Sequence, residues 1–438
     1  MLAAGWVVDE NGALRRETIH HMGRRLPGWD YRRRGYYVIT IVLENRRSAA
    51  LGELKIRRPA VGTAGAEWVS VGEAKGLGLE PDRVEAKVVY SELGRAIFDH
   101  FKKMGEFTPG LEPVYCAVMP DHLHLLLKVE RELKRPLGNA IGGFKAGCEK
   151  IYARLGGEGR LFAEGFVDHV ILRGGQLAIE FNYLRDNPRR LAVKRLFPEL
   201  FRVSRRVGVA LRGLGNQQLA LLEHDRHEAP QGQDRQGAGE GAALEGAGVS
   251  GAPAARAVGY FSALGNHFLL DRPLAQVQVS RRFFGYRRLN GRIARDARGE
   301  PLVDFSTPEY EARRDELFAA ARHGAVLISP CISDGERQIA REALAAGVPL
   351  VTMANKGFAP LQKPSGRLFD ACSDGRLLML APAAWPYLPG EKPVTRSDAT
   401  AMNRLCQWLA GEGAAEINYR GLLPANIDAL AKAAAKIA

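Results

Sequence analysis

The chain has 438 residues and carries 62 Lys and Arg against 49 Asp and Glu, a formal net charge of +13. Its hydrophobic fraction of 46% is enough for packed cores, which excludes a globally disordered protein, and its length predicts two or three domains. No stretch reaches the roughly 18 uncharged apolar residues that a membrane-spanning helix needs. The first ten residues also lack a basic head followed by an apolar run. We therefore expect a cytoplasmic protein without a secretory signal or a membrane partner.

The cysteines give no sign of a disulfide framework or a zinc site. They are five in number, and no two have the CxxC spacing. We expect separate, reduced and mostly buried thiols at Cys116, Cys148, Cys331, Cys372 and Cys406.

The positive charge is concentrated in the first half of the chain. Residues 1–210 hold 35 Lys and Arg against 25 Asp and Glu, whereas residues 211–438 hold 27 against 24. A cationic half rich in arginine is typical of nucleic-acid binding, although a solvated basic surface would have the same composition.

In chain order, residues 1–30 form an N-terminal extension with no assigned structure, and the first strand is expected at 36–43, a β-branched and aromatic run. A helix capped by Ser91 follows at 91–104, then strands at 114–119 and 123–129. Helices are expected at 137–154 and 176–186, with a short apolar segment at 166–172 between them. These elements predict an α+β domain of ferredoxin-like type over 31–210, an antiparallel sheet with its helices on one face.

The second half begins after a compositional break. Residues 223–256 are rich in Gly, Ala and Gln with almost no large apolar residue, which predicts a flexible linker. Beyond it, strands are expected at 325–329, 348–353 and 377–380, with a helix at 335–346 after the first. Strand, helix and strand at this spacing indicate a parallel sheet, and hence a Rossmann-like α/β domain over 258–438.

The most informative local pattern is MPDHLHL at 119–125. Alternate residues of a strand share a face, so His122 and His124 would lie side by side with Leu123 on the opposite face. Two adjacent imidazoles are a natural pair of ligands for a divalent metal, and burying them without a partner would be costly.

A second pattern, FNYLRDNPRR, lies at 181–190. Tyr183 and Asn187 are four residues apart and share a helical face, and Pro188 is expected to end the helix, placing Asn187 in a frayed last turn. A phenol beside a carboxamide oxygen would suit attack on a phosphodiester, although a single helical tyrosine is more often a packing residue. The arginines expected to bind DNA phosphates are Arg32, Arg33, Arg34, Arg189 and Arg190.

Taken together, VYCAVMPDHLHLLLKV and FNYLRDNPRRLAVK resemble the histidine strand and the tyrosine helix of the HUH endonucleases. They are most similar to the single-tyrosine insertion-sequence transposases and the REP-associated tyrosine transposases. The resemblance covers about residues 33–201. It implies a nucleoid-associated enzyme that processes single-stranded or hairpin DNA, with Tyr183 as the nucleophile that forms a 5′-phosphotyrosine.

The same resemblance implies that His122, His124 and Asn187 hold Mg²⁺ or Mn²⁺, and that the protein can form a homodimer. A His-His-Asn set should bind magnesium weakly unless a DNA phosphate completes the coordination shell. Two alternatives remain open: a relative that binds hairpin DNA without cutting it, and an unrelated metal-dependent hydrolase. His169 could stand near the site as a proton carrier, but an ordinary strand histidine is the favoured interpretation.

Two segments of the second half could contact a ligand. Residues 329–337 join a strand end to a helix start, where parallel sheets bind anions, although no Walker A or GxGxxG pattern occurs. The run ISDGERQIAREALAAGVPLV loosely resembles the Rossmann-like fold of DNA-processing protein A, which implies binding of DNA or a nucleotide; a scaffold is an equal alternative. The basic and aromatic segment 279–288 would suit stacking on single strands.

Overall fold

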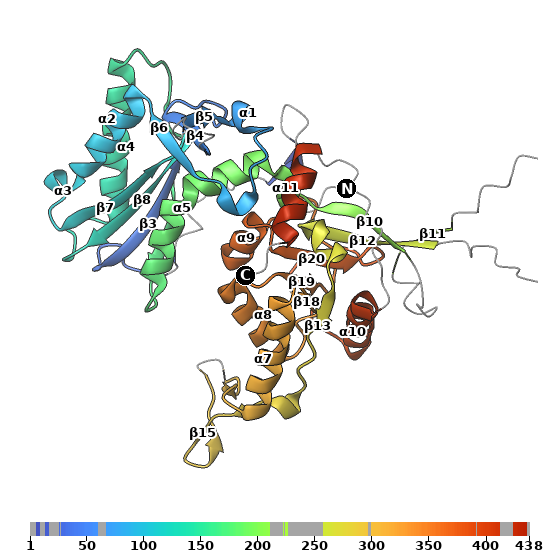
Figure 1. Ribbon diagram of the computed structural model, residues 1–438. Helices are drawn as coiled ribbons and strands as arrows, with labels where there is room; N and C mark the ends of the chain where they lie inside the picture. Colours follow the sequence, from blue (N-terminus) through green and yellow to red (C-terminus); the bar gives the residue numbers. More distant parts are fainter. Residues whose placement is uncertain are drawn as a thin grey trace, which may run out of the picture. The chain divides into compact units, whose positions relative to one another are not determined.

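The computed structural model places the chain in two compact units, residues 1–74 with 85–192 and residues 75–84 with 193–438 (Figure 1). It describes residues 6–8, 14–16, 26, 28–59, 67–210, 222, 224–226, 257–296, 299–390, 392–411 and 424–435. Most of the expected extension 1–30 and most of the expected linker 223–256 lie outside these residues. Within the extension, β1 (Trp6–Val8) and β2 (Leu14–Arg16) pair antiparallel.

The main sheet of the first unit is antiparallel, with strand order β7-β8-β3-β9. Its strands are β3 (Gly35–Val42), β7 (Leu111–Val118), β8 (His122–Val129) and β9 (Val167–Ile171). β3, β7 and β8 match the expected strands, and β9 forms within the apolar segment 166–172. The central pair β3 and β8 is the most deeply buried part of the sheet.

Helices cover both faces of this sheet (Figure 1). Side chains of α2 (Glu92–Lys102) and α4 (Leu137–Arg154) pack with the face that carries Ile39 and Leu125. The long helix α5 (Gln176–Leu196) packs through Leu184 against Val38 and Leu126 on the other face. The expectation that all helices lie on one face was therefore wrong for α5, because β3 and β8 are apolar on both faces.

A smaller sheet and two short helices complete the first unit. β4 (Gly52–Arg58) lies between β5 (Glu67–Ser70) and β6 (Ala86–Tyr90), with α1 (Val71–Ala74) after β5. The helix α3 (Met104–Phe107) follows α2, whose N-cap Ser91 accepts a hydrogen bond from Gly94 N at 3.0 Å as the sequence predicts.

The second unit is built on a mixed sheet with strand order β10-β12-β20-β19-β18-β13. The run β20-β19-β18-β13 is parallel, which confirms the expected parallel sheet, and β12 joins it antiparallel. The strands are β10 (Ser204–Ala210), β12 (Ala257–Gly265), β13 (Leu274–Gln276), β18 (Val326–Ser329), β19 (Leu350–Met353) and β20 (Leu377–Pro382). The helices are α7 (Pro308–Arg322), α8 (Asp334–Ala346), α9 (Gly366–Ser373), α10 (Arg396–Gly411) and α11 (Pro424–Ala435).

The expected boundary after residue 210 differs from the structure. β10 pairs with β12, so residues 204–210 belong to the second unit, and the division of the chain falls after Ala192. The short strand β11 (His224–Arg226), inside the expected linker, also pairs with β12. Residues 204–210 are basic and show no clear alternation of polar and apolar side chains, so the sequence did not indicate that they pair with a strand of the second unit.

No helix among the described residues is long and apolar enough to cross a bilayer. All five cysteines are free; Cys331 is partly exposed and the other four are buried.

Candidate active site

His122 and His124 occupy one face of β8, as the alternation of the strand predicts. Their ring centroids lie 4.8 Å apart with the ring planes at 86°. Leu126, two residues further on, packs against α5, whereas Leu123 and Leu125 belong to the core on the opposite face. The two imidazoles are therefore on the face of the sheet that α5 covers.

Asp121 and Arg46 support the first histidine. Nδ1 of His122 lies 2.7 Å from Oδ1 of Asp121, and Arg46 contacts the other carboxylate oxygen at 3.3 Å. Burial of Asp121 acts to raise its pKa, but the hydrogen bond from His122 and the charges of His122 and Arg46 hold that pKa below its usual value. An ionised carboxylate that accepts from Nδ1–H leaves the Nε2 lone pair of His122 available to a metal.

Thr40 supports the second histidine from the neighbouring strand. Its hydroxyl lies 2.8 Å from Nδ1 of His124, and Thr40 and His124 are paired in the register of β3 and β8. His124 is only 8% exposed. Burial, reinforced by the nearby His122 and partly offset by Asp121, lowers the pKa of His124 to about 3. Its ring is therefore neutral at physiological pH, which is the form that binds metals.

Tyr183 is brought to the histidines by α5. Its ring centroid lies 6.1 Å from that of His124 at an interplanar angle of 70°. The guanidinium of Arg190 lies 4.8 Å from the centre of the tyrosine ring on the same helix. Tyr183 is 37% exposed, so its ring touches the buried histidine face while part of it remains accessible to solvent.

Asn187 lies inside α5, not at its end. The helix continues through Pro188 to Leu196, which corrects the expectation of a frayed last turn. Proline removes the backbone hydrogen bond to residue 184 and crowds that carbonyl, but the helix beyond it is held by buried residues, among them Ala192 and Val193. Asn187 is consequently placed one turn after Tyr183 in a rigid segment and is only 7% exposed.

The side-chain amide of Asn187 identifies it as a candidate ligand. Among the described residues, its buried Nδ2 has no hydrogen-bond partner. Amide nitrogen and oxygen are interchangeable by rotation, and a buried amide end without a partner is costly. With the amide turned so that its oxygen takes this buried position, a cation bound to that oxygen would satisfy it.

The donor set fits a divalent ion. Within the described residues, the only hydrogen bond of each histidine ring is at Nδ1, so both Nε2 atoms remain available, and the amide of Asn187 on α5 is unsatisfied. No group of three or more His, Cys, Asp or Glu side chains suited to a metal occurs in the described part of the chain. Three protein ligands of the His-His-Asn type would leave coordination positions for phosphate oxygens.

The five arginines expected to bind DNA fall into two groups. Arg190 lies at the site over Tyr183, and Arg189 forms an ion pair with Asp186 at 2.8 Å. Arg32, Arg33 and Arg34 precede β3 at the opposite end of the sheet from His122, because Gly35 pairs with Val129 and Val42 with His122. Seven strand residues span about 23 Å, so this group cannot contact the same phosphate as the histidines.

Within the N-terminal arginine group, the side chains differ in their contacts. Arg32 is paired with Asp30 at 3.0 Å and with Glu132 at 3.2 Å, and Arg33 lies over the Trp29 ring at 5.9 Å. Arg34 is exposed and lines an open surface pocket with Lys128 and Arg131. Arg34 is thus the member best placed to meet a phosphate at that end of the sheet.

His169 is held by the start of α5. Its Nε2 lies 2.6 Å from Nε2 of Gln176 and 3.7 Å from Oε1 of Glu180, and its strand position pairs with Val38. These contacts account for His169 as a strand histidine that anchors the first turns of α5.

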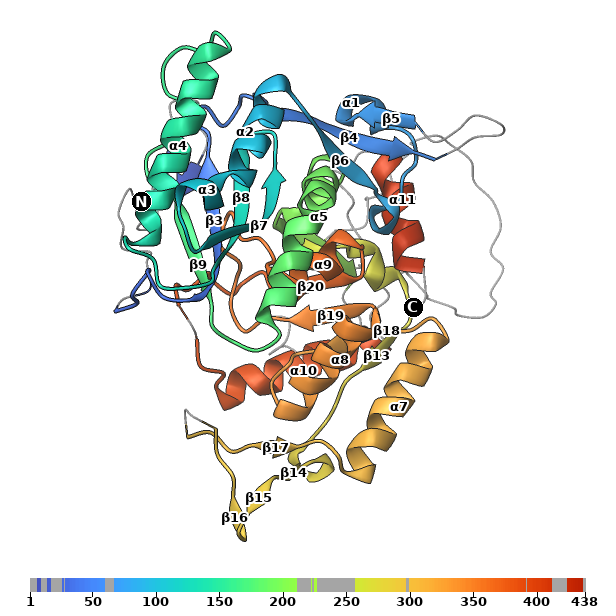
Figure 2. The same cartoon turned by 90° about the vertical axis from the view of Figure 1, so that its left-hand side faces the viewer.

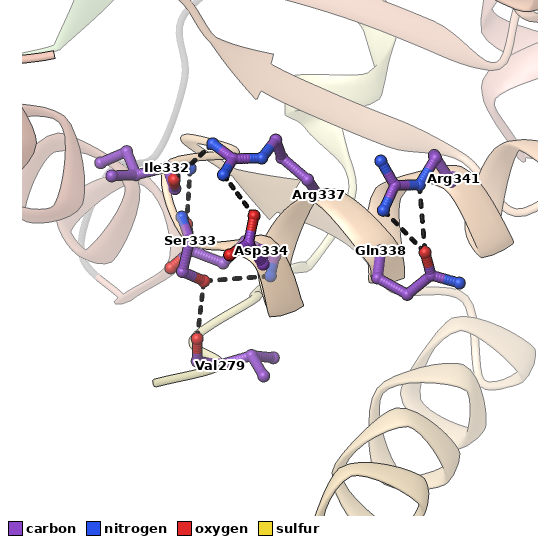
Figure 3. A network of polar contacts seen from close by, with 8 residues as sticks. Val279, Ile332, Ser333, Asp334, Arg337, Gln338 and Arg341 are labelled. Atoms are coloured by element: carbon purple, nitrogen blue, oxygen red, sulfur yellow. Dashed lines mark hydrogen bonds and ion pairs between the residues drawn. The ribbon is translucent and has the colours of Figure 1, made fainter. Parts of the chain in front are cut away.

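The junction before α8 in the second unit is closed by its own side chains (Figure 3). Glu336 accepts hydrogen bonds from the backbone amides of Ile332 and Ser333 at 2.8 and 3.1 Å, and Ser333 completes a capping box. Arg337 donates to the Ile332 carbonyl and to Asp334, both at 2.6 Å. An incoming anion would meet two carboxylates here, so the geometry does not favour the anion site that the strand-to-helix pattern suggested.

Sequence reasoning missed Thr40, Asp121 and Arg46. Asp121 could have been predicted, since a metal-binding histidine commonly donates its second ring N–H to a nearby carboxylate. Thr40 and Arg46 are 84 and 75 residues from their partners in sequence, and only the pairing of β3 with β8 brings them near.

Comparisons with known proteins are sparse. No family model matches the chain, and no curated protein matches it. Among solved structures it is similar to a REP-associated tyrosine transposase bound to a REP hairpin, with 15% identity and a TM-score of 0.22. The match covers 35% of this chain and 66% of that one. The function of this chain is therefore inferred from its side-chain geometry.

Proposed function

We propose that the chain is a metal-dependent tyrosine endonuclease and strand transferase that cuts single-stranded or hairpin DNA through a 5′-phosphotyrosine. One observation carries the proposal: the ring centroid of Tyr183 lies 6.1 Å from that of His124, on the sheet face that both histidines share. A tyrosine with a purely packing role has no need to lie beside two imidazoles that are held with their Nε2 atoms available.

In the proposed reaction, Oη of Tyr183 attacks the scissile phosphorus. A phosphorus–oxygen bond to tyrosine forms, and the bond from phosphorus to the 3′-oxygen breaks. The phenolic proton passes to solvent, and the departing 3′-oxygen takes up a proton from solvent. The phosphotyrosine conserves the energy of the broken bond, so a 3′-hydroxyl can later displace the tyrosine and rejoin a strand without ATP.

The surrounding side chains support this reaction in different ways. Arg190, 4.8 Å from the ring of Tyr183, places a cation beside the negative charge that develops on the phenol. His122, His124 and Asn187 would hold Mg²⁺ or Mn²⁺, which when bound supplies Lewis-acid polarisation of the phosphate. Asp121 and Thr40 position the two imidazoles.

The test is a labelled hairpin oligonucleotide incubated with the full chain and Mn²⁺, followed by denaturing electrophoresis. We expect a covalent protein–DNA adduct that does not form when the metal is chelated before the DNA is added. Tyr183→Phe should abolish it, and His124→Ala should slow it by on the order of 1,000-fold. Tyr115→Phe is the matched control because Tyr115 packs with Phe181 on the same face, with its ring centroid 5.2 Å away, and should leave the adduct unchanged.

Three results would contradict the proposal. An adduct that persists in Tyr183→Phe would assign another nucleophile. Tight hairpin binding without an adduct under either metal would indicate a DNA-binding protein that does not cut. Metal-dependent hydrolysis that survives Tyr183→Phe and leaves no adduct would make the two histidines part of a different enzyme.

A further inference from the structure

A projecting hairpin in the second unit concentrates unpaired positive charge. Residues 281–295 contain six arginines and no Asp or Glu. The segment runs through β14 (Gly285–Tyr286) into the hairpin of β15 (Arg288–Leu289) and β16 (Arg292–Ile293), and the chain returns in β17 (Val303–Asp304). The β15–β16 hairpin extends away from the sheet of its unit (Figures 1 and 2). We call residues 285–295 the arm.

The arginines of this segment differ in their contacts from three other arginines of the same unit. Arg314, Arg337 and Arg376 each contact a neighbouring carboxylate at 2.9 Å or less. Among the described residues, no carboxylate forms an ion pair with any of the six, which are Arg281, Arg282, Arg287, Arg288, Arg292 and Arg295. Guanidinium groups at this density without an ion pair favour a polyanionic partner.

The base of the arm is rigid. Phe284 packs on Phe305 at 5.5 Å, and Phe305 packs on the buried Tyr310 at 5.0 Å. The turn at the tip is also well defined, because Asn290 and Gly291 both have positive φ, at 52° and 78°. Two such residues are typical of the tight type I′ hairpin turn. The arm therefore presents its tip without a large ordering cost on binding.

The two faces of the tip carry the same mixture of side chains. Leu289 pairs with Arg292, and Arg288 pairs with Ile293. Directly opposite residues of an antiparallel pair share a face, so each face has one arginine and one aliphatic side chain. Leu289 is 69% exposed. A membrane-binding ribbon would gather its apolar residues on one face, whereas a groove of duplex DNA has phosphates on both walls and apolar base edges between them.

We propose that the arm is a duplex-DNA binding site, with Arg288 and Arg292 contacting the phosphates of opposite groove walls and Leu289 at the groove floor. This inference rests on the proposed function in one respect: it identifies the polyanion as the stem of the DNA that Tyr183 would cut. Stacking of single strands, the expectation for residues 279–288, would depend on Tyr286, which is 37% exposed, because the other two aromatic rings of the segment are covered. Phe284 is buried against Phe305, and Arg282 covers Phe283 at 5.0 Å.

The experiment measures binding of two fluorescent DNAs to the full chain over a range of salt concentrations. One is a hairpin with a stem of about two helical turns, and the other is an unpaired strand of the same length. The arm variant is Arg288→Ala with Arg292→Ala. The matched control is Arg314→Ala with Arg337→Ala, which removes the same charge from paired sites of the same unit.

We expect the arm variant to bind the stem at least tenfold more weakly at physiological salt, with a salt slope shallower by about 2, since each phosphate contact contributes about 0.9. The control should bind like the unmodified chain. Binding of the unpaired strand and adduct formation on it should be unchanged in the arm variant. Circular dichroism and thermal melting verify that both variants are folded.

Two outcomes would overturn the arm proposal: equal stem affinity and salt slope in the arm variant and the control, or equal loss of stem and single-strand binding. Failure of the proposed function has a different signature. If no adduct forms with any DNA but stem binding still depends on Arg288 and Arg292, the arm proposal stands and the catalytic one fails.

Discussion

The histidine face of the first unit and the strand-to-helix junction of the second unit both gather polar side chains, but only the first leaves polar atoms without partners. Around α8, Ser333, Glu336, Asp334 and Arg337 satisfy one another and the local backbone. On the histidine face, the amide of Asn187 has no partner among the described residues, and each imidazole uses only Nδ1. The polar groups of the junction therefore stabilise α8, whereas those of the histidine face remain able to bind the proposed metal ion.

The largest expected effect on stability comes from a buried group of the second unit that, unlike the junction, has no hydrogen-bond partner in the described part of the chain. His267 in the second unit is buried, its Nε2 has no partner among the described residues, and burial lowers its pKa to about 4. The unfolded chain takes up a proton below about pH 6.5, whereas the folded chain does so only near pH 4. The second unit should therefore lose about 3 kcal/mol of stability as the pH falls from 7 to 4.

Urea unfolding at several pH values, followed by peptide-resolved hydrogen exchange in the second unit, measures this loss. His267→Leu should remove most of that pH dependence. His323→Leu is the control, since His323 is exposed at the end of α7 and bonds through Nδ1 to the Ala319 carbonyl at 2.7 Å. An unaltered pH profile in His267→Leu would show that another group is responsible.

Asp121→Asn sharpens the comparison on the side of the histidine face. It keeps the shape of the side chain but removes the charge that orients His122 and accepts from Nδ1–H. We expect Mn²⁺ affinity, measured by calorimetry, to fall by about 10- to 100-fold. Asp186→Asn, which breaks an ion pair on α5, is the control and should leave Mn²⁺ affinity unchanged. Equal Mn²⁺ affinity in Asp121→Asn and the unmodified chain would remove Asp121 from the site.

Ser333→Ala is the complementary change at the junction and has the smallest expected effect. It removes the capping hydroxyl that accepts from Glu336 N at 3.1 Å, so α8 should lose about 1 kcal/mol of stability. Hydrogen exchange in α8 should accelerate, while adduct formation at Tyr183 should not change. A loss of adduct in this variant would contradict the separation of roles between the two regions.

The local pattern of the sequence was a good guide wherever one element decides the outcome. Alternation along β8 correctly predicts that His122 and His124 share a face, and the helix expected at 335–346 appears as α8, which ends at Gly347 with φ 77°. Pro188 was misleading, because a single missing hydrogen bond is outweighed where buried side chains hold the helix on both sides of it.

The sequence by itself determined the residue types of the candidate site, the strand and helix that carry them, and the concentration of charge in the first half. Only the tertiary structure decided that α5 crosses the sheet on the face of the histidines, that Thr40 and Asp121 set the two imidazoles, and that β10 belongs to the second unit. The physical reason is that side-chain periodicity is a property of neighbouring residues. The choice of which apolar face receives a helix, or which edge receives a strand, depends on packing between residues far apart in the chain.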